Sequence, residues 1–434
     1  MSTTLSHEDV TTSEVVEVPQ TRRARITLGV LFVVAGLAAA SFGLFHGAAD
    51  TARFRLSTAQ DAVELPDVAV GITALGLGLG AVCLVLAGYQ IARGFGRTAR
   101  RWAVAVAVGC AVVSFLGWAT TNGNGSTLNV PDLLRATVYL AVPLVLGALV
   151  GVVSERSGVI NVAIEGHMLA GAFAGAVVGT VAGNLWVGVI GAVLVGIAVA
   201  ALLAVFALRY QVNQVVLGVV INLLVLGLTN YLFSSLLQRD KEALNSPGFF
   251  RRVRIPVLAD IPVIGPTLFD ATALVYITVG VIVLVQIGLM RTRWGLRTRS
   301  VGEHPRAADT VGIEVNRLRF RNVLLAGAIA GLAGAAVSIG SVGDFNSNMT
   351  AGRGFIALAA VIVGRWTPLG AVGAAVLFAF LSSLQVVLGI TGTPVDIPSQ
   401  GLAMLPYLAT IVIVAGAAGR VRPPAADGIP YVKG

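Results

Sequence analysis

The stretch LWVGVIGAVLVGIAVAALLAVFAL, residues 185–208, contains neither a charged side chain nor a proline. An α-helix needs about 20 apolar residues to cross the hydrocarbon core of a bilayer. A helix also satisfies every backbone N–H and C=O internally, which a lipid environment demands. The stretch therefore predicts a membrane-spanning helix.

The composition of the whole chain agrees with this prediction. Of its 434 residues, 56% are hydrophobic and only 12% are charged, and the mean hydropathy is +0.86. Soluble domains carry about 25% charged residues. Because so few charges cannot cover a water-facing surface, the apolar excess must face lipid. The 52 glycines favour closely packed helices, since small residues let helix backbones approach each other in a membrane.

Apolar runs of spanning length recur along the chain. Ten are clear: 26–45, 68–91, 102–119, 132–153, 185–208, 213–236, 272–290, 321–342, 369–390 and 402–418. Two more, 162–183 and 353–364, are short or interrupted by polar residues, and they could be full spans, broken helices or re-entrant segments. The predicted fold is an all-α polytopic membrane protein with ten to twelve transmembrane helices, including broken or short half-helices in its core.

The arginines behind the net charge of +9 gather in particular loops, at 22–25, 93–101, 291–321 and 420–422. If both uncertain stretches cross, these loops all fall on one side of the membrane. By the positive-inside rule that side is cytoplasmic. We therefore expect twelve crossings of a bacterial inner membrane with both termini cytoplasmic, and no nucleic-acid-binding surface. The long loop 237–271 carries basic residues on the predicted outer side, which long loops are able to do.

Polar residues at membrane depth begin after about residue 130, which suggests a division of the chain. We expect a polar cytoplasmic tail (1–25), a three-span extension (26–125), a working core (126–420) and a second cytoplasmic tail (421–434). Cys83 and Cys110 lie in apolar runs and are predicted to be small buried side chains, not a disulfide or metal site.

The segment SERSGVINVAIEGH, residues 154–167, interrupts apolar sequence with charged and polar groups. Such groups are costly at membrane depth and face a cavity or a partner. Asn161 and Glu165 are four residues apart, a spacing that puts both on one face if the segment is helical. Their role is either to line a solute pathway or to hydrogen-bond neighbouring helices.

Two further groups of polar residues could line a solute pathway or serve only the structure. Gln214, Gly218, Asn222 and Thr229 share one face of the span 213–236. A second group, Asp344, Asn346, Asn348 and Arg353, lies at the start of the short run 353–364. This Gly-rich segment either presents the free N–H groups of a half-length helix to a pathway or forms an outer loop. The predicted substrate-pathway residues are Asn161, Glu165, Gln214, Asn222, Asn346 and Asn348.

The segment RTRSVGEHPRAADTVGIEV, residues 297–315, is polar, rich in arginine and on the predicted cytoplasmic side. Pro305 suits the first turn of a helix, and Gly312 suits its end. The segment predicts a helix of about two turns lying flat against the membrane; the alternative is a solvated loop.

Several catalytic motifs are missing from the sequence. Its only lysines, Lys241 and Lys433, follow Asp and Val, so no G-x-x-x-x-G-K-[ST] phosphate loop is possible. HExxH, GxSxG and Cys/His metal spacings are also missing. We therefore expect no catalytic residue, no metal site and no cofactor in this chain, and we do not expect an enzyme.

Four motifs in order resemble a known family. The run SERSGVINVAIEGHMLAGAFAG (154–175) strongly resembles a signature of the simple-sugar and nucleoside ABC permeases, within the branched-chain amino acid permease superfamily. The runs VNQVVLGVVINLLVLGLTNYLF (212–233), RSVGEHPRAADTVGIEV (299–315) and GRGFIALAAVIVGRWTPLGA (352–371), followed by LPYLATIVIV (405–414), resemble later parts of the same family. The resemblance covers about residues 126–420 and leaves the extension unexplained.

The resemblance implies a permease subunit that translocates a nucleoside or simple-sugar-like solute by alternating access. It implies a separate ABC ATPase that binds ATP and Mg²⁺, a second homologous permease forming a heterodimer, and an extracytoplasmic lipid-anchored solute-binding protein. The segment from about His304 to Val311 then becomes the coupling helix. The implied ATPase-coupling residues are Glu303, His304, Pro305, Arg306, Ala307, Ala308, Asp309 and Gly312.

Two other classes of function fit the sequence less well. A stand-alone secondary transporter would use Glu165 as a proton site, but the long coupling-like loop argues against it. A membrane-embedded enzyme lacks a nucleophile, a metal site and an acid–base cluster.

Overall fold

The computed structural model describes residues 21–57, 63–122, 127–395, 397–408, 411 and 422–433. Within these ranges, ten helices are long and apolar enough to cross a membrane. They are α1 (Arg22–Leu44), α2 (Ile72–Ala92), α3 (Arg97–Ala119), α4 (Val130–Glu155), α5 (Ile164–Val181), α6 (Leu185–Ala204), α7 (Gln214–Leu232), α10 (Ala273–Arg291), α13 (Val315–Val337) and α15 (Pro368–Thr391). The predicted all-α polytopic membrane fold is confirmed. The predicted span 402–418 lies mostly outside the described residues.

Shorter elements connect or extend these helices. π-Helical turns η1 (Val205–Arg209), η2 (Phe233–Leu237) and η4 (Ser338–Val342) extend α6, α7 and α13, while η3 (Leu258–Asp260) is a 3₁₀ turn. The short helices are α8 (Lys241–Leu244), α9 (Ile264–Leu268), α11 (Arg293–Glu303), α12 (Pro305–Thr310), α14 (Arg353–Val363) and α16 (Ser399–Ala403). The strands are β1 (Thr51–Arg55), β2 (Val68–Gly71) and β3 (Leu128–Asn129), in the order β2-β1-β3, and the antiparallel pair β4 (Arg252–Arg254) and β5 (Asp270–Thr272).

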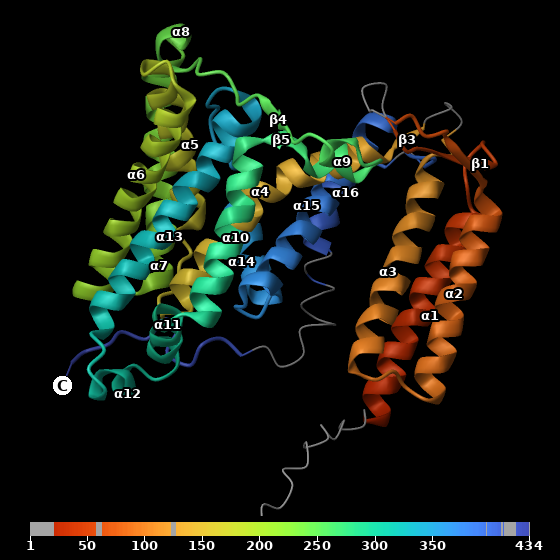
Figure 1. Cartoon of the computed structure of the whole chain (residues 1–434), viewed down its shortest axis with the longest axis horizontal. Helices are drawn as coiled ribbons and strands as arrows, with labels where there is room; N and C mark the ends of the chain where they lie inside the picture. The colour runs from red at the N-terminus through yellow and green to blue at the C-terminus, as the bar shows by residue number, and fades with distance from the viewer. Residues whose placement is uncertain are drawn as a thin grey trace, which may run out of the picture. The chain divides into compact units, whose positions relative to one another are not determined.

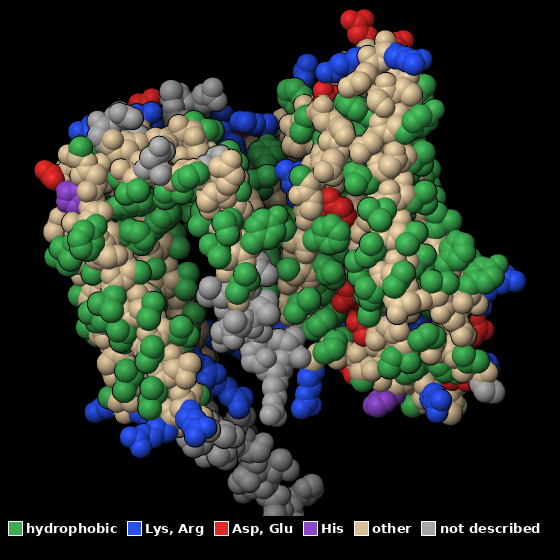
Figure 2. All heavy atoms as spheres, turned by 180° about the vertical axis from the view of Figure 1, so that it is seen from behind, with side chains coloured by type: hydrophobic (Ala, Val, Ile, Leu, Met, Phe, Trp, Pro, Cys, Tyr) green, Lys and Arg blue, Asp and Glu red, His purple; other side chains and the backbone are tan. Residues whose placement is uncertain are grey.

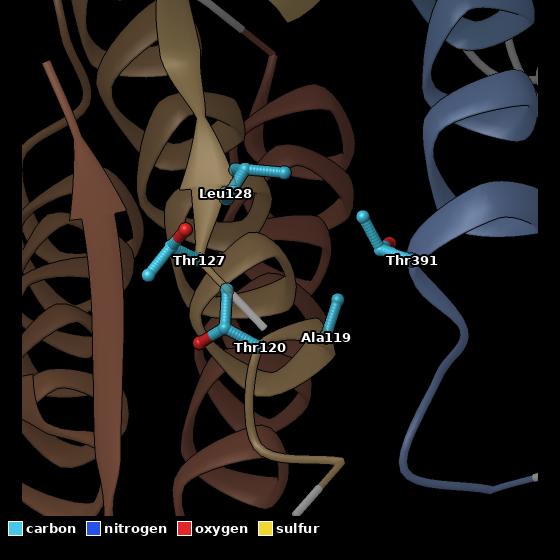
Figure 3. A pocket seen from close by; sticks show the side chains of 5 residues that line it. All are labelled: Ala119, Thr120, Thr127, Leu128 and Thr391. Carbon is cyan, nitrogen blue, oxygen red and sulfur yellow. The ribbon is translucent and has the colours of Figure 1, made fainter. Parts of the chain in front are cut away.

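The chain folds as two compact units, and the first contains α1, α2 and α3. Helices α1 and α2 touch through glycines: a Cβ added to Gly76 would lie 2.5 Å from the Cα of Gly43. Ser114 on α3 donates a hydrogen bond to the carbonyl of Ala39 at 2.7 Å. Both cysteines are free and buried, as predicted. Figure 3 shows a crevice of this unit, lined by Ala119, Thr120, Thr127, Leu128 and Thr391, which is too narrow to hold a solute.

The second unit contains α4 to α16 and is built around α4 and α13, the two spans with the largest buried share. Leu146 and Leu149 of α4 are fully buried in the same hydrophobic cluster as Ala330 and Ala333 of α13. Helices α5, α6, α10 and α14 surround this pair (Figure 1). Outward-facing residues are large and apolar, such as Leu284, which is 72% exposed. Figure 2 shows hydrophobic side chains on the flanks of the helices and Lys and Arg gathered near their ends, as a membrane protein requires.

The second unit has two distinct ends, which Figure 1 shows below and above. Helices α11 and α12 lie at one, the α12 end; α8 and the β4–β5 pair lie at the other, the α8 end. The predicted helix at 305–312 is found as α12, with Pro305 in its first turn and Gly312 in the left-handed conformation (φ +84°) after its end. At six residues, α12 is a little shorter than predicted.

The uncertain stretch 353–364 is part of a broken crossing. Its helix, α14, has 11 residues, about 16 Å, roughly half of a 30 Å hydrocarbon core. The turns before it start at the α8 end, where the Phe345 N–H donates to Asn245 Oδ1 at 2.7 Å. The chain after it reaches the α12 end, where Arg156 Nε donates to the Trp366 carbonyl at 2.7 Å. A run of turns and a half-helix together therefore traverse the unit.

The other uncertain stretch contains a helix of full spanning length, α5, preceded by an irregular connection over residues 156–163. Because α5 begins at Ile164, Asn161 lies outside it. The expectation that Asn161 and Glu165 share a helical face is therefore wrong: Gly158, at φ +88°, and the turn after it end the helical path between α4 and α5.

Candidate functional site: the α14 entry and the α12 loop

Glu165 lies in the first turn of α5, 8% exposed, and its carboxylate binds the entry of α14. One oxygen accepts hydrogen bonds from Thr350 Oγ1 at 2.6 Å and the Gly352 N–H at 2.8 Å. The other accepts from the Gly354 N–H at 2.6 Å. The first N–H groups of a helix have no partner inside it and carry a partial positive charge. Glu165 therefore neutralises the end of a half-helix that lies inside the protein.

The chain of the α14 entry is tightly constrained. A Cβ added to Gly354 would lie 2.5 Å from the backbone nitrogen of Glu165, so only glycine fits between the two helix starts. Asn348 and Ala351 have left-handed backbones, at φ +53° and +46°. For residues other than glycine this conformation costs of order 1 kcal/mol each, and such strain collects at functional sites. The Glu165 hydrogen bonds hold this strained turn in place.

The polar face predicted on α7 exists, and it points at the connection between α4 and α5. Asn222 accepts a hydrogen bond from the Gly166 N–H at 2.7 Å and donates one to the Val162 carbonyl at 2.9 Å. Gln214 Oε1 accepts from the Ile160 N–H at 2.8 Å. These bonds are those expected if the face joins helix α7 to a neighbouring segment.

Asn161 lies in that connection and is fully buried, at 0% exposure. Neither its amide nitrogen nor its amide oxygen has a hydrogen-bond partner within the described part of the chain, and the same holds for Gln214 Nε2. An unpaired buried polar group costs about 1–3 kcal/mol. The α4–α5 connection thus holds polar groups that its own fold leaves unsatisfied.

Asn346 and Asn348 lie in the turns that lead from the α8 end to α14. Both are exposed, and Asn346 Nδ2 donates to Asp344 Oδ1 at 2.8 Å. Asp344 also forms an ion pair with Lys241 of α8 at 3.0 Å. The structure thus bonds Gln214 and Asn222 to the backbone on either side of Asn161. It also ties Glu165 to the turn that contains Asn348. That these six residues contact a solute stays a prediction.

The predicted coupling residues divide into exposed and buried sets. Glu303, His304, Arg306, Ala307 and Gly312 are exposed, Pro305 and Asp309 are half-buried, and Ala308 is buried. Ala308 packs with Val301, Val315 and Tyr431 in a small hydrophobic cluster. Ala308 therefore does not belong to the exposed surface of α12.

The carboxyl-terminal segment 422–433, expected to be a tail, is bound to the α12 end. The Ala426 N–H donates to the Gly302 carbonyl at 2.8 Å, and the Ala425 N–H donates to Glu303 Oε2 at 3.2 Å. Lys433 Nζ lies 3.7 Å from Asp309 Oδ1. The sequence RPPAADGIPY (422–431) does indicate a bound segment, because it is rich in proline and apolar residues, whereas a solvated tail would be rich in charge.

Arg319, near the start of α13, binds this segment through hydrogen bonds to its backbone. The side chain is 0% exposed, and it donates to the carbonyls of Ser157 at 3.0 Å, Ile429 at 2.8 Å and Ala426 at 3.4 Å. Asp427 lies nearby; burial raises the pKa of its carboxyl to about 7, and the positive charge of Arg319 opposes part of that rise. Arg319 therefore joins α13, the α4–α5 connection and the carboxyl-terminal segment.

Arg156, just after α4, connects the two parts of the site. Its Nε donates to the Trp366 carbonyl after α14, and its Nη1 lies 3.9 Å from Glu303 Oε1 at the end of α11. The Trp366 indole N–H donates to Glu155. The segment 293–314, which contains α11 and α12 and is here named the α12 loop, is thus linked to the far end of α14 through one guanidinium group.

An apolar helical core with ten helices of spanning length in the described residues and a broken crossing is that of a multi-pass membrane protein. The chain belongs to the family described as "Branched-chain amino acid transport system / permease component", whose model matches residues 133–416. It is an ABC transporter permease, and the stand-alone transporter alternative is not supported.

Individual relatives agree with this family. The chain is 39% identical to the guanosine ABC transporter permease protein NupQ of Bacillus subtilis, over 70% of this chain and 97% of that protein. It is 38% identical to the nucleoside ABC transporter permease protein NupC of Lactococcus lactis, over 71% of this chain and 99% of that protein. A putative glucose ABC transporter permease protein, TsgC13 of Haloferax volcanii, is 37% identical over 58% of this chain and 77% of its own length. No solved structure matches the chain significantly.

Proposed function

We propose that this chain forms the membrane pathway of an ABC importer for nucleosides, or for simple-sugar-like solutes, and that a separate ATPase drives it by alternating access. The observation that carries the proposal is the Arg156 link between the α12 loop and the far end of α14. A displacement of α12 by a partner is transmitted through this contact to the broken crossing. The names of NupQ and NupC favour a nucleoside, and that of TsgC13 favours a sugar.

The partners follow from the same assignment. The sequence contains no phosphate loop, so ATP and Mg²⁺ belong to the ATPase. We place the exposed face of α12, with His304, Arg306 and Ala307, in contact with that ATPase, which makes the α12 end cytoplasmic. Both termini are then cytoplasmic, the α8 end receives a lipid-anchored solute-binding protein, and a second homologous permease completes a heterodimer.

We assign different tasks to the predicted pathway residues. Asn346 and Asn348 are exposed on the approach from the α8 end, where the solute enters. Glu165, Gln214 and Asn222 hold α14 and the α4–α5 connection in place through their hydrogen bonds. Asn161, which lacks a partner within the described chain, gains one when the connection moves.

The docking assignment is tested by reversing a charge on α12. We expect Arg306→Glu to reduce the amount of ATPase that co-purifies with the permease several-fold, because Arg306 is exposed on the docking face. Arg239→Glu is the matched control, since Arg239 is also exposed but follows η2 at the α8 end. Equal recovery of the ATPase with both variants would contradict the assignment.

A further inference from the structure

A cavity of about 360 Å³ lies beside the entry of α14 and is formed by four separate parts of the second unit. Leu140 and Leu144 of α4 form one wall, and Arg353 of α14 another. Ser382 and Gln385, one turn apart on α15, also line it, as does Tyr407, which follows α16. Small-molecule pockets in proteins measure roughly 300–1,000 Å³. The cavity therefore has room for one small solute.

The polar groups of the cavity are hydrogen-bond donors and amides. Arg353 makes one hydrogen bond within the described chain, to the Met349 carbonyl at 2.9 Å, although a guanidinium group has five N–H donors. Gln385 adds an amide that both donates and accepts, and Tyr407 adds an aromatic ring with a hydroxyl. The lining contains no Asp or Glu. Such a lining suits a solute with carbonyl or ring-nitrogen acceptors.

The charge around the cavity argues for a neutral solute. A half-helix that starts inside a membrane protein can attract an anion to its free N–H groups. Here the Glu165 carboxylate already occupies the Gly352 and Gly354 N–H groups. Glu165 also interacts electrostatically with Arg353, which offsets its positive charge. An anionic solute therefore gains little from this helix end.

The apolar part of the lining distinguishes between neutral solutes. Leu140, Leu144 and Ile356 add aliphatic surface to the lining, beside its polar groups. A sugar carries hydroxyl groups all around its ring and leaves such surface unmatched, whereas a nucleobase has apolar faces and a polar edge. Arginine pairs well with the adjacent carbonyl and ring-nitrogen acceptors of a guanine-type base.

We propose that this cavity holds the solute during translocation and selects neutral nucleosides, with Arg353 and Gln385 bonding to the edge of the base. The inference rests on the proposed import function and adds the site and its selectivity. It also locates the solute on the α14–α15 side of the core, and not along the α7 face, whose amides bind the α4–α5 connection.

Protection of single cysteines from a thiol reagent tests this placement in the assembled transporter. In a background of Cys83→Ala and Cys110→Ala, Gln385→Cys and Ser382→Cys introduce thiols into the cavity. Ile390→Cys, on the same helix but 82% exposed and outside the lining, is the matched control. We expect guanosine to slow modification of the Gln385→Cys and Ser382→Cys variants several-fold, to leave the Ile390→Cys variant unchanged, and glucose to have no effect.

Uptake kinetics provide a second readout. Gln385→Ala should raise the KM for guanosine about tenfold while the amount of protein in the membrane and of co-purified ATPase stays unchanged. Failure of guanosine to protect the cavity thiols, or equal protection by glucose, overturns the inference even if wild-type uptake is normal. Absence of ATPase-dependent nucleoside uptake by the wild-type protein overturns the proposed function together with it.

Discussion

At the scale of single residues, the site is organised by Glu165, a carboxylate whose importance shows in the sequence but whose partners do not. A charged group inside an apolar run is conspicuous, which is why Glu165 was predicted. Its partners Thr350, Gly352 and Gly354 lie almost two hundred residues further along the chain, and no local spacing connects them.

Replacing Glu165 by glutamine tests its structural role. Glu165→Gln keeps the shape but leaves one acceptor oxygen and puts an NH₂ group against backbone N–H donors. Hydrogen bonds to a charged group contribute about 1.5–3 kcal/mol each. We expect the melting temperature of the purified permease to fall clearly, whereas Glu242→Gln on exposed α8 leaves it unchanged. Equal melting temperatures of the two variants would show that Glu165 does not hold α14.

Gly354 gives a second test at this scale. In Gly354→Ala the new methyl group meets the Glu165 backbone at about 2.5 Å, so α14 must shift away from α5. We expect lower stability and loss of uptake. Gly373→Ala is the control, because nothing lies within 4 Å of its added Cβ and alanine favours a helix over glycine by up to about 1 kcal/mol. An unfolding transition of Gly354→Ala at or above that of Gly373→Ala contradicts the close packing described.

At the scale of elements, the long membrane spans could be predicted from the sequence. For the stretches 162–183 and 353–364, the sequence could not distinguish a full span from a broken helix or a re-entrant segment. Apolar length alone identifies α4, α6 or α15 because the bilayer sets that length. Asn161 and Glu165 have helical spacing, which predicts a shared face, but the chain turns between α4 and α5 and the helix begins only at Ile164. The place where segment 422–433 docks does not follow from the sequence because it depends on Arg319, which the positive-inside rule places only among the basic residues of a cytoplasmic loop.

Tyr431 tests whether the docked segment supports α12. Its side chain is 9% exposed and packs against Ala308 and Val301, whereas the neighbouring Val432 is 66% exposed. We expect Tyr431→Ala to free the segment from α12 and to lower ATPase co-purification several-fold, with Val432→Ala unchanged. The release is also measurable as faster proteolysis of the carboxyl-terminal segment. Identical proteolysis rates in both variants would mean that Tyr431 does not anchor it.

At the scale of the whole molecule, the family match begins at residue 133, after the three helices of the first unit. The candidate site lies within the second unit, from the α14 entry to the α12 loop. Composition and span length were enough to predict a membrane protein, and the polar motifs were enough to suggest the family. The route by which α12 connects to α14 required the structure, because Arg156, Glu303 and Trp366 come from three distant parts of the chain.

The most direct test of this account is the energy source of uptake. Cells that express the permease should import labelled guanosine, and deletion of the partner ATPase gene should abolish that uptake. An uncoupler that collapses the proton gradient while cellular ATP is maintained should leave it largely intact. Guanosine uptake that persists without the ATPase and collapses with the uncoupler would contradict the account.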